Sequence, residues 1–110
     1  MTGENIIEEA KNYLGSVYVP GGDNPNGFDS LGFIKYIFKK VAGKNLSQNY
    51  NELINVGKKV GKKELKKGDI IFSHKQAGIY IGDGQIITVD KKKGVKIATI
   101  VDFNTARRVL

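Results

Sequence analysis

Few side chains in this sequence could carry nucleophilic or acid–base chemistry. The 110 residues contain one histidine, His74, and no cysteine. Thiol catalysis and disulfide bonds are therefore excluded, and a serine hydroxyl that replaced a thiol as nucleophile would need a strong base nearby. A metal site is not indicated either, because one histidine, no cysteine and scattered carboxylates give no ligand spacing. We expect neither a metal nor a cofactor.

Helical periodicity marks the first half of the chain. Residues 4–14 repeat apolar side chains at helical spacing, with Thr2 as a cap and Gly15 as a stop. A second helix is predicted over residues 30–41, where a broad apolar stripe is typical of a central core helix. Asn49, with a glutamate three residues later, predicts the start of a short third helix.

The apolar period changes to two in the second half, where short runs of branched and aromatic residues predict strands. These runs are residues 69–72, 77–81, 85–89 and 95–97, and residues 106–110 could add a last strand. The Gly82-Asp83-Gly84 segment predicts a hairpin turn and not a phosphate loop, because no helix follows it. Helices followed by antiparallel strands predict an α+β fold in a single domain over residues 1–110.

The chain is basic, with a formal net charge of +7 from 18 lysines and arginines against 11 acidic residues. Much of the excess lies in lysine clusters at residues 58–59, 62–63, 66–67 and 91–93. Two interpretations stay open: solvated loops that keep a small domain soluble, or attraction to a polyanion such as an anionic cell-wall polymer. Specific nucleic-acid binding is not expected, since no recognised nucleic-acid motif accompanies the lysines.

The sequence also bears on location and assembly. No apolar run approaches the ~20 residues of a membrane-spanning helix. Residues 1–5 lack the basic start and apolar stretch of a signal peptide. We therefore expect a monomer without a membrane span, either in the cytoplasm or as a mature or excised part of an exported protein.

Six segments in the same order and spacing resemble the NlpC/p60 family of cell-wall cysteine peptidases. They are residues 13–15 (YLG), 18–22 (YVPGG), 27–29 (GFD), 32–38 (GFIKYIF), 64–72 (ELKKGDIIF) and 77–82 (AGIYIG). The resemblance covers about residues 5–108. It implies a papain-like fold, in which a helix with the nucleophile at its N-terminus packs on an antiparallel sheet that supplies the other catalytic groups. It also implies a place outside the cell, at the cell wall.

The same resemblance implies a reaction whose residues this chain lacks. Family members use a thiolate, a histidine base and a third polar residue that orients the imidazole. With these they cut between D-glutamate and the diamino acid or lysine of peptidoglycan stem peptides. The matching positions here are Ser30, Gln76 and Thr88. Two neighbours differ as well, with Leu31 in place of the usual serine and Pro20 in place of the usual aromatic residue.

These replacements indicate a catalytically inactive domain, a pseudoenzyme. The side-chain amide of Gln76 cannot accept a proton at neutral pH, so a serine at position 30 lacks a base. Tyr18 and Asp29, which in the family help line the stem-peptide pocket, are retained. We therefore expect the domain to bind peptidoglycan stem peptides or wall polymer through Tyr18, Asp29, Ser30, Gln76 and Thr88. Plainer roles stay open, since Ser30 or Asp29 could cap the second helix and Tyr18 could be half-buried packing.

Two other functions also stay open. An active hydrolase of the D-glutamyl–diamino acid endopeptidase type would use Ser30 as its nucleophile, with His74 and Asp90 two residues from the family's base and orienting positions. Two residues along a strand keep the same face but span about 6.5 Å, against a required reach of about 3 Å. A regulatory or protein-interaction domain would instead have its groove filled by an apolar side chain such as Leu31, with an exposed apolar patch elsewhere.

Overall fold

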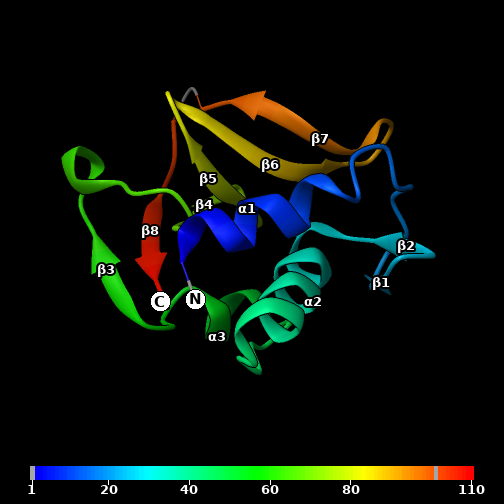
Figure 1. The fold of residues 1–110 in the computed structure, drawn as a ribbon, viewed down its shortest axis with the longest axis horizontal. Helices are drawn as coiled ribbons and strands as arrows, with labels where there is room; N and C mark the ends of the chain where they lie inside the picture. Colours follow the sequence, from blue (N-terminus) through cyan, green and yellow to red (C-terminus); the bar gives the residue numbers. More distant parts are fainter. Residues whose placement is uncertain (1, 101) are drawn as a thin grey trace.

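The computed structural model describes residues 2–100 and 102–110 and shows the predicted α+β architecture (Figure 1). The first half holds helix α1 (Gly3–Lys11), the short hairpin of β1 (Asp23–Asn24) and β2 (Gly27–Phe28), helix α2 (Ser30–Ala42) and helix α3 (Tyr50–Leu53). The second half holds β3 (Lys58–Val60), the 3-10 turn η1 (Lys62–Glu64), β4 (Ile70–Ser73), β5 (Gln76–Gly82), β6 (Gln85–Asp90), β7 (Gly94–Thr99) and β8 (Thr105–Arg108).

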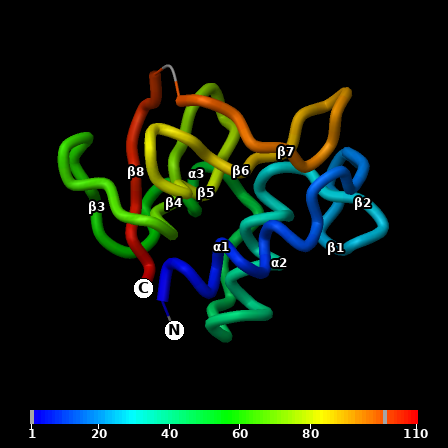
Figure 2. Tube along the Cα trace, turned by 45° about the horizontal axis from the view of Figure 1, so that its top comes forward, coloured from blue at the N-terminus to red at the C-terminus, as the bar shows by residue number. Residues whose placement is uncertain are grey.

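The larger strands form one antiparallel sheet in the order β3-β8-β4-β5-β6-β7. Strands β4 to β7 pair with one another in chain order, and the last strand then inserts between β3 and β4. The connection from β7 to β8 must therefore pass β6, β5 and β4. Helices α1 and α2 lie on one side of this sheet, and the β1–β2 hairpin lies at the opposite end of the molecule from β3 (Figures 1 and 2).

Two apolar clusters pack on the two faces of the sheet. The larger lies between the sheet and the helices, and its largest fully buried side chains include Phe28, Phe33, Phe38, Phe72, Ile79 and Ile87. The smaller lies on the other face and joins Val60, Ile71 and Ala106, with Leu65, Tyr80, Ile86, Ile100 and Phe103 packed against them. Alternate residues of a strand point to opposite faces, which explains why Ile71 packs away from its neighbour Phe72.

The structure confirms in part where the first and third helices were predicted to begin and end. Thr2 caps α1, and the side chain of Asn5 accepts its backbone N–H in return. The helix ends at Lys11 and not at residue 14, because the chain turns away into the loop that leads to β1. Asn49 caps α3 as predicted, since its side chain accepts the backbone N–H of Glu52.

Both tight turns around β5 use positive φ angles. The β5–β6 turn has Asp83 at +53° and Gly84 at +72°, and the β4–β5 turn has His74 at +50° and Lys75 at +61°. Such turns match the twist of a hairpin, and Asp-Gly is a favoured pair for them. A side chain with a Cβ costs about 1–2 kcal/mol in this conformation. The His-Lys turn therefore holds strained backbone directly before strand β5.

Strand β3 and turn η1 were not predicted, because a lysine-rich segment shows no alternation of apolar residues. Strand β3 is the polar edge of the sheet, a position where lysines discourage pairing with another chain. Its partner β8 is held to the residue before β4 by Arg108, whose guanidinium donates two hydrogen bonds of 2.8 Å to the buried carboxylate of Asp69. Within the described residues, no helix combines the length and the apolar character that crossing a membrane requires.

Candidate functional site

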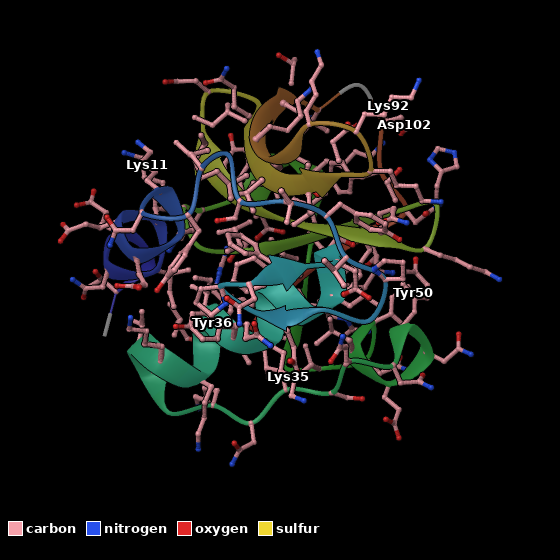
Figure 3. The ribbon with its side chains drawn as sticks, turned by 90° about the vertical axis from the view of Figure 1, so that its right-hand side faces the viewer. Lys11, Lys35, Tyr36, Tyr50, Lys92 and Asp102 are labelled. Atoms are coloured by element: carbon pink, nitrogen blue, oxygen red, sulfur yellow. The ribbon has the colours of Figure 1, made fainter. Side chains whose placement is uncertain are left out.

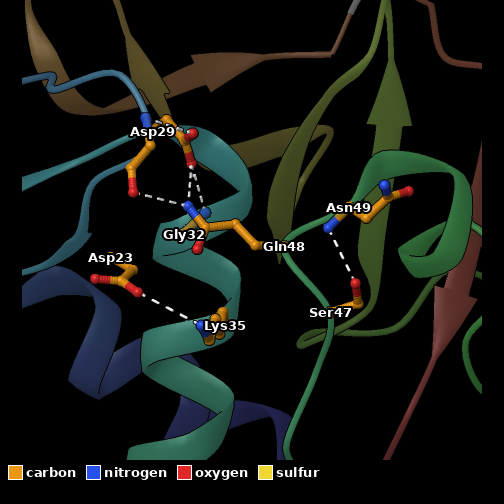
Figure 4. Close-up of polar contacts among 8 residues, drawn as sticks. Asp23, Asp29, Gly32, Lys35, Ser47, Gln48 and Asn49 are labelled. Carbon is orange, nitrogen blue, oxygen red and sulfur yellow. Dashed lines mark hydrogen bonds and ion pairs between the residues drawn. The ribbon is translucent and has the colours of Figure 1, made fainter.

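Helix α2 begins at Ser30, directly after its N-cap residue Asp29, so the idea that Ser30 itself caps the helix is wrong. One Asp29 oxygen accepts the backbone N–H of Gly32 across 2.6 Å, and the other accepts that of Gly21 across 3.1 Å. The side-chain amide of Gln48 donates to the first oxygen across 3.4 Å and to the Gly21 carbonyl across 3.0 Å (Figure 4). The Asp29 carboxylate thus fastens the preceding loop to the start of α2.

The hydroxyl of Ser30 uses its hydrogen-bonding capacity inside the protein. Ser30 is 2% exposed, and its Oγ donates to the side-chain carbonyl of Gln76 across 2.8 Å. The same oxygen accepts the backbone N–H of Ala77 across 3.1 Å. An amide oxygen does not take up a proton near neutral pH, so this partner cannot activate the hydroxyl as a nucleophile. The contact joins the start of α2 to the start of β5.

Thr88 reaches the same short stretch of β5 from the neighbouring strand. It pairs with Gly78 across the β5–β6 ladder, and its hydroxyl donates to the backbone carbonyl of Ala77 across 2.8 Å. The three predicted positions therefore meet around one residue, Ala77: Ser30 accepts its N–H, Thr88 donates to its carbonyl, and Gln76 precedes it. The Thr88 hydroxyl donates to the strand and not to the amide of Gln76.

The residues of the alternative hydrolase site lie elsewhere. His74 is exposed in the β4–β5 turn, and its Nδ1 lies 2.9 Å from the hydroxyl of the preceding serine. The Asp90 carboxylate accepts the backbone N–H groups of Lys93 and Lys92 across 2.8 and 2.9 Å, which holds the pKa of that carboxyl below its usual range. Neither His74 nor Asp90 is among the hydrogen-bond partners of Ser30 in the described chain.

Three hollows meet at Gln76. The smallest, of about 100 Å³, is lined by Tyr18, Asp29, Ser30, Leu31, Lys75 and Gln76. Two larger hollows, of about 340 and 470 Å³, both include Gln76, Ile86 and Thr88. Small-molecule sites commonly measure about 300–1,000 Å³, so the hollow beside Tyr18 and Asp29 admits only a small group. Most of the open volume lies on the Thr88 side of Gln76.

The two larger hollows open on the face of the sheet that carries the smaller apolar cluster. Lys92 and Asp102, which line one each, lie on the sheet side of the molecule, away from Lys35 and Tyr36 on α2 (Figure 3). Leu31 lines the small hollow and also packs against the main core. The interaction alternative, which expects an apolar side chain such as Leu31 in the groove, therefore stays a prediction.

Sequence reasoning missed two residues of this region. Gln48, which holds Asp29 and the loop at Gly21, comes from a segment 19 residues beyond Asp29 and carries no local signal. Lys75 lines the small hollow together with Gln76. Its place directly before Gln76, the residue predicted to match the family's histidine, was a signal that could have indicated it.

Comparison with known proteins identifies the sequence family. The sequence profile of the NlpC/P60 family matches residues 15–109. The chain is 41% identical over 106 residues to a γ-DL-glutamyl hydrolase of Bacillus subtilis, covering 92% of this chain and 25% of that protein. It is 32% identical over 110 residues to a probable endopeptidase NlpC homolog of Haemophilus influenzae, covering 97% of this chain and 60% of that protein. The chain therefore spans only part of the length of these relatives.

Solved structures give the same result for the fold. The NlpC/p60 domain of the peptidoglycan hydrolase SagA superposes with a TM-score of 0.92 at 28% identity, covering 98% of this chain and 99% of that one. RipD of Mycobacterium tuberculosis, a non-catalytic NlpC/p60 domain protein, superposes with a TM-score of 0.81 at 24% identity, covering 98% and 97%. The predicted fold is confirmed, and the family profile matches residues 15–109 of this chain. The chain therefore belongs to the NlpC/P60 family.

Proposed function

We propose that this domain binds glutamate-containing peptides of the cell wall, above all peptidoglycan stem peptides, and does not cleave them. One observation carries the proposal: the Ser30 hydroxyl donates to the amide oxygen of Gln76, at the place where a nucleophile requires a base. The replaced positions form a satisfied hydrogen-bond arrangement around Ala77. Removal of a triad member generally leaves only the weak catalysis of binding and oxyanion contacts.

The ligand class is supported by what the relatives are named for. The B. subtilis relative is named a γ-DL-glutamyl hydrolase, and SagA is a peptidoglycan hydrolase. RipD is described as adapted to peptidoglycan binding without catalysis, although its likeness to this chain concerns the fold alone. A peptide containing glutamate is the ligand common to the first relative and to the family's reaction. Such a ligand would place this domain at the cell wall.

Groups suited to a peptide surround Gln76. Its Oε1 is used by Ser30, whereas its Nε2 has no hydrogen-bond partner within the described chain and can donate to a peptide carbonyl. Tyr18 lines the small hollow on one side, and Thr88 lines the two larger hollows on the other. A bound peptide would therefore cross Gln76, with its ends in different hollows.

The test is sedimentation of the purified domain with insoluble peptidoglycan, combined with mass spectrometry of the soluble fraction. We expect the domain to pellet, no stem-peptide fragments to be released, and Gln76→Ala to lower the pelleted fraction. Asn51→Ala, on the exposed face of α3, is the matched control and should pellet like the unchanged domain. Fragments that disappear in Ser30→Ala would show a hydrolase instead. Neither pelleting nor fragments would favour a protein-interaction domain.

A further inference from the structure

The two edge strands of the sheet differ in how they are protected against pairing with another strand. Strand β3 is polar and carries the exposed residues Lys58 and Lys59. Strand β7, the opposite edge, forms the upper margin of the molecule in Figure 1. Its one lysine, Lys96, pairs with Thr88 and lies on the face of the smaller apolar cluster. Lysines discourage pairing at an edge, so β7 is the more open of the two edges.

The outer side of β7 is bonded at one end and open at the other. The N–H of Val95 donates to the Ser16 carbonyl across 2.9 Å, and the carbonyl of Val95 accepts the N–H of Gly15 across 2.8 Å. Hydrogen-bonding groups alternate in direction along a strand, so Ile97 and Thr99 also direct theirs outward. Among residues 2–100 and 102–110, no backbone hydrogen bond links these two residues to another segment on that side. Two N–H and two C=O groups therefore lie open at the spacing of a strand.

Exposed apolar side chains gather beside this open edge. The large apolar side chains that the described chain exposes are Leu14, Val17, Val19, Ile97 and Leu110. Ile97 is 37% exposed, although its partner across the ladder, Ile87, is fully buried in the main core. The hydrogen bonds to Val95 hold residues 14–17 across one end of β7. The main core thus ends in an exposed apolar patch at this edge, and such patches commonly mark contacts with other proteins.

The charge around β7 favours an acidic partner over a second copy of the chain. Residues 90–99 contain four lysines and one aspartate, which give a formal net charge of +3. Asp90 keeps its negative charge, because the backbone N–H groups of Lys93 and Lys92 hold the pKa of its carboxyl below the usual range. A second copy would bring an equal positive charge to the same edge, and like charges repel. A strand with acidic side chains would be attracted instead.

We infer that the outer edge of β7 accepts an extended segment of a partner protein as an added strand, paired with Ile97 and Thr99. This surface is separate from the proposed peptidoglycan site, so either can fail without the other. A polypeptide main chain supplies N–H and C=O groups at the spacing that the edge presents. Alternate side chains of the segment are apolar over Ile97 and acidic on the face that carries Lys96. Pairing begins at Ile97, because residues 15–16 already occupy the outer side of Val95.

The test uses the whole domain and a hexapeptide of three Glu-Val repeats, blocked at both ends. In an NMR titration we expect the amide signals of Ile97 and Thr99 to shift and their hydrogen exchange to slow by about fivefold or more at saturation. The amide of Ala98, which faces β6, should keep its slow exchange throughout. The control peptide has the same side chains but is N-methylated at every residue, so it lacks N–H donors and should produce no shift. Equal binding of both peptides, or shifts confined to residues around Gln76, would overturn the inference.

A pair of matched variants tests the apolar contact. Ile97→Thr keeps a β-branched side chain on the strand and removes apolar surface. Leu110→Thr makes a similar change at a side chain that is 41% exposed and lies outside β7. We expect Ile97→Thr to weaken the Kd for the hexapeptide by about fivefold and Leu110→Thr by less than about twofold. Unchanged melting temperatures show that both variants are folded, and equal losses in both would overturn the inference.

Two further measurements separate this surface from its alternatives. Sedimentation velocity should show a monomer, and a dimer that Ile97→Thr abolishes would assign the edge to a second copy and overturn the partner proposed here. Pelleting with peptidoglycan should be the same in Ile97→Thr as in the unchanged domain. Loss of pelleting in this variant would show that the edge belongs to the peptidoglycan site, and would refute a separate protein contact.

Discussion

The hydroxyl of Ser30 donates a hydrogen bond to the side-chain carbonyl of Gln76 across 2.8 Å, where the start of α2 meets the start of β5. The same hydroxyl accepts the backbone N–H of Ala77, and Thr88 donates to the carbonyl of that residue. The positions that the family resemblance predicts to match its catalytic residues connect α2 to β5 here. Stability and activity can therefore be tested with the same substitutions.

Ser30→Ala should destabilise the domain and leave the release of stem-peptide fragments unchanged. The buried N–H of Ala77 would lose its partner, and an unsatisfied buried donor costs about 1–3 kcal/mol. Urea unfolding followed by circular dichroism measures the loss. Ser47→Ala is a useful control, because that hydroxyl is only half-buried and should cost less. An unchanged unfolding midpoint in Ser30→Ala would show that the contact with β5 contributes nothing to stability.

Two substitutions of Asp29 separate the helix cap from the loop contact. Asp29→Ala removes the acceptors for Gly32 and Gly21 and should cost about 1 kcal/mol for the cap alone. Asp29→Asn keeps one oxygen, so it should retain the helix cap and lose the contact with Gly21. Its melting temperature should therefore lie between those of Asp29→Ala and the unchanged domain. Hydrogen exchange of the Gly21 amide should accelerate in both variants. Equal melting temperatures for Asn and Ala would contradict a capping role.

The features that the sequence predicted well are those that repeat along the chain. The apolar stripe of α2 and the alternating strands from β4 to β7 predicted the α+β fold, because burial of one face leaves a period in the sequence. The site positions Ser30, Gln76 and Thr88 came from the family resemblance. Their contacts around Ala77 could not be predicted, since they depend on how closely a helix end approaches a strand.

Contacts between distant segments left no sequence signal. Gln48 reaches Asp29 from 19 residues away, and nothing near Gln48 indicates that role. The position of the two larger hollows could not be predicted either. It depends on which face of the strands the β7–β8 connection leaves uncovered. Strand β3 was missed for a different reason: an exposed edge strand gains little from apolar residues, so its lysines resemble those of a loop.

The β4–β5 turn offers a test of strain beside the site. His74 and Lys75 both have positive φ, a conformation that Asn and Gly adopt more readily. His74→Asn with Lys75→Gly should therefore raise the free energy of unfolding by about 1 kcal/mol or more. The same change removes the cation of the small hollow and should lower the fraction of the domain that pellets with peptidoglycan. Asp83→Asn, in the already favoured β5–β6 turn, should change neither quantity. A lower melting temperature in the double variant would contradict the strain.

A tyrosine between α1 and α2 makes stability depend on alkaline pH. The Tyr13 hydroxyl donates to Glu9 across 2.7 Å, lies 3.3 Å from the hydroxyl of Tyr36 and accepts from Lys40 across 3.0 Å. Burial, more than any of these contacts, raises the pKa of Tyr13 to about 12 from an ordinary value of 10.0. The hydrogen bond to Tyr13 is also the main reason that the pKa of Lys40 is raised.

The sign of the pH effect follows from the raised pKa. The folded state favours the neutral phenol of Tyr13, so this contribution to stability is complete below pH 10 and is lost as the pH rises from 10 through about 12. An ultraviolet titration of tyrosinate should show one group ionising near pH 12 that is missing in Tyr13→Phe, and the variant should lose less stability over this interval. If the tyrosine signal that Tyr13→Phe removes ionises near pH 10 instead, then burial between the two helices does not hold the Tyr13 phenol neutral.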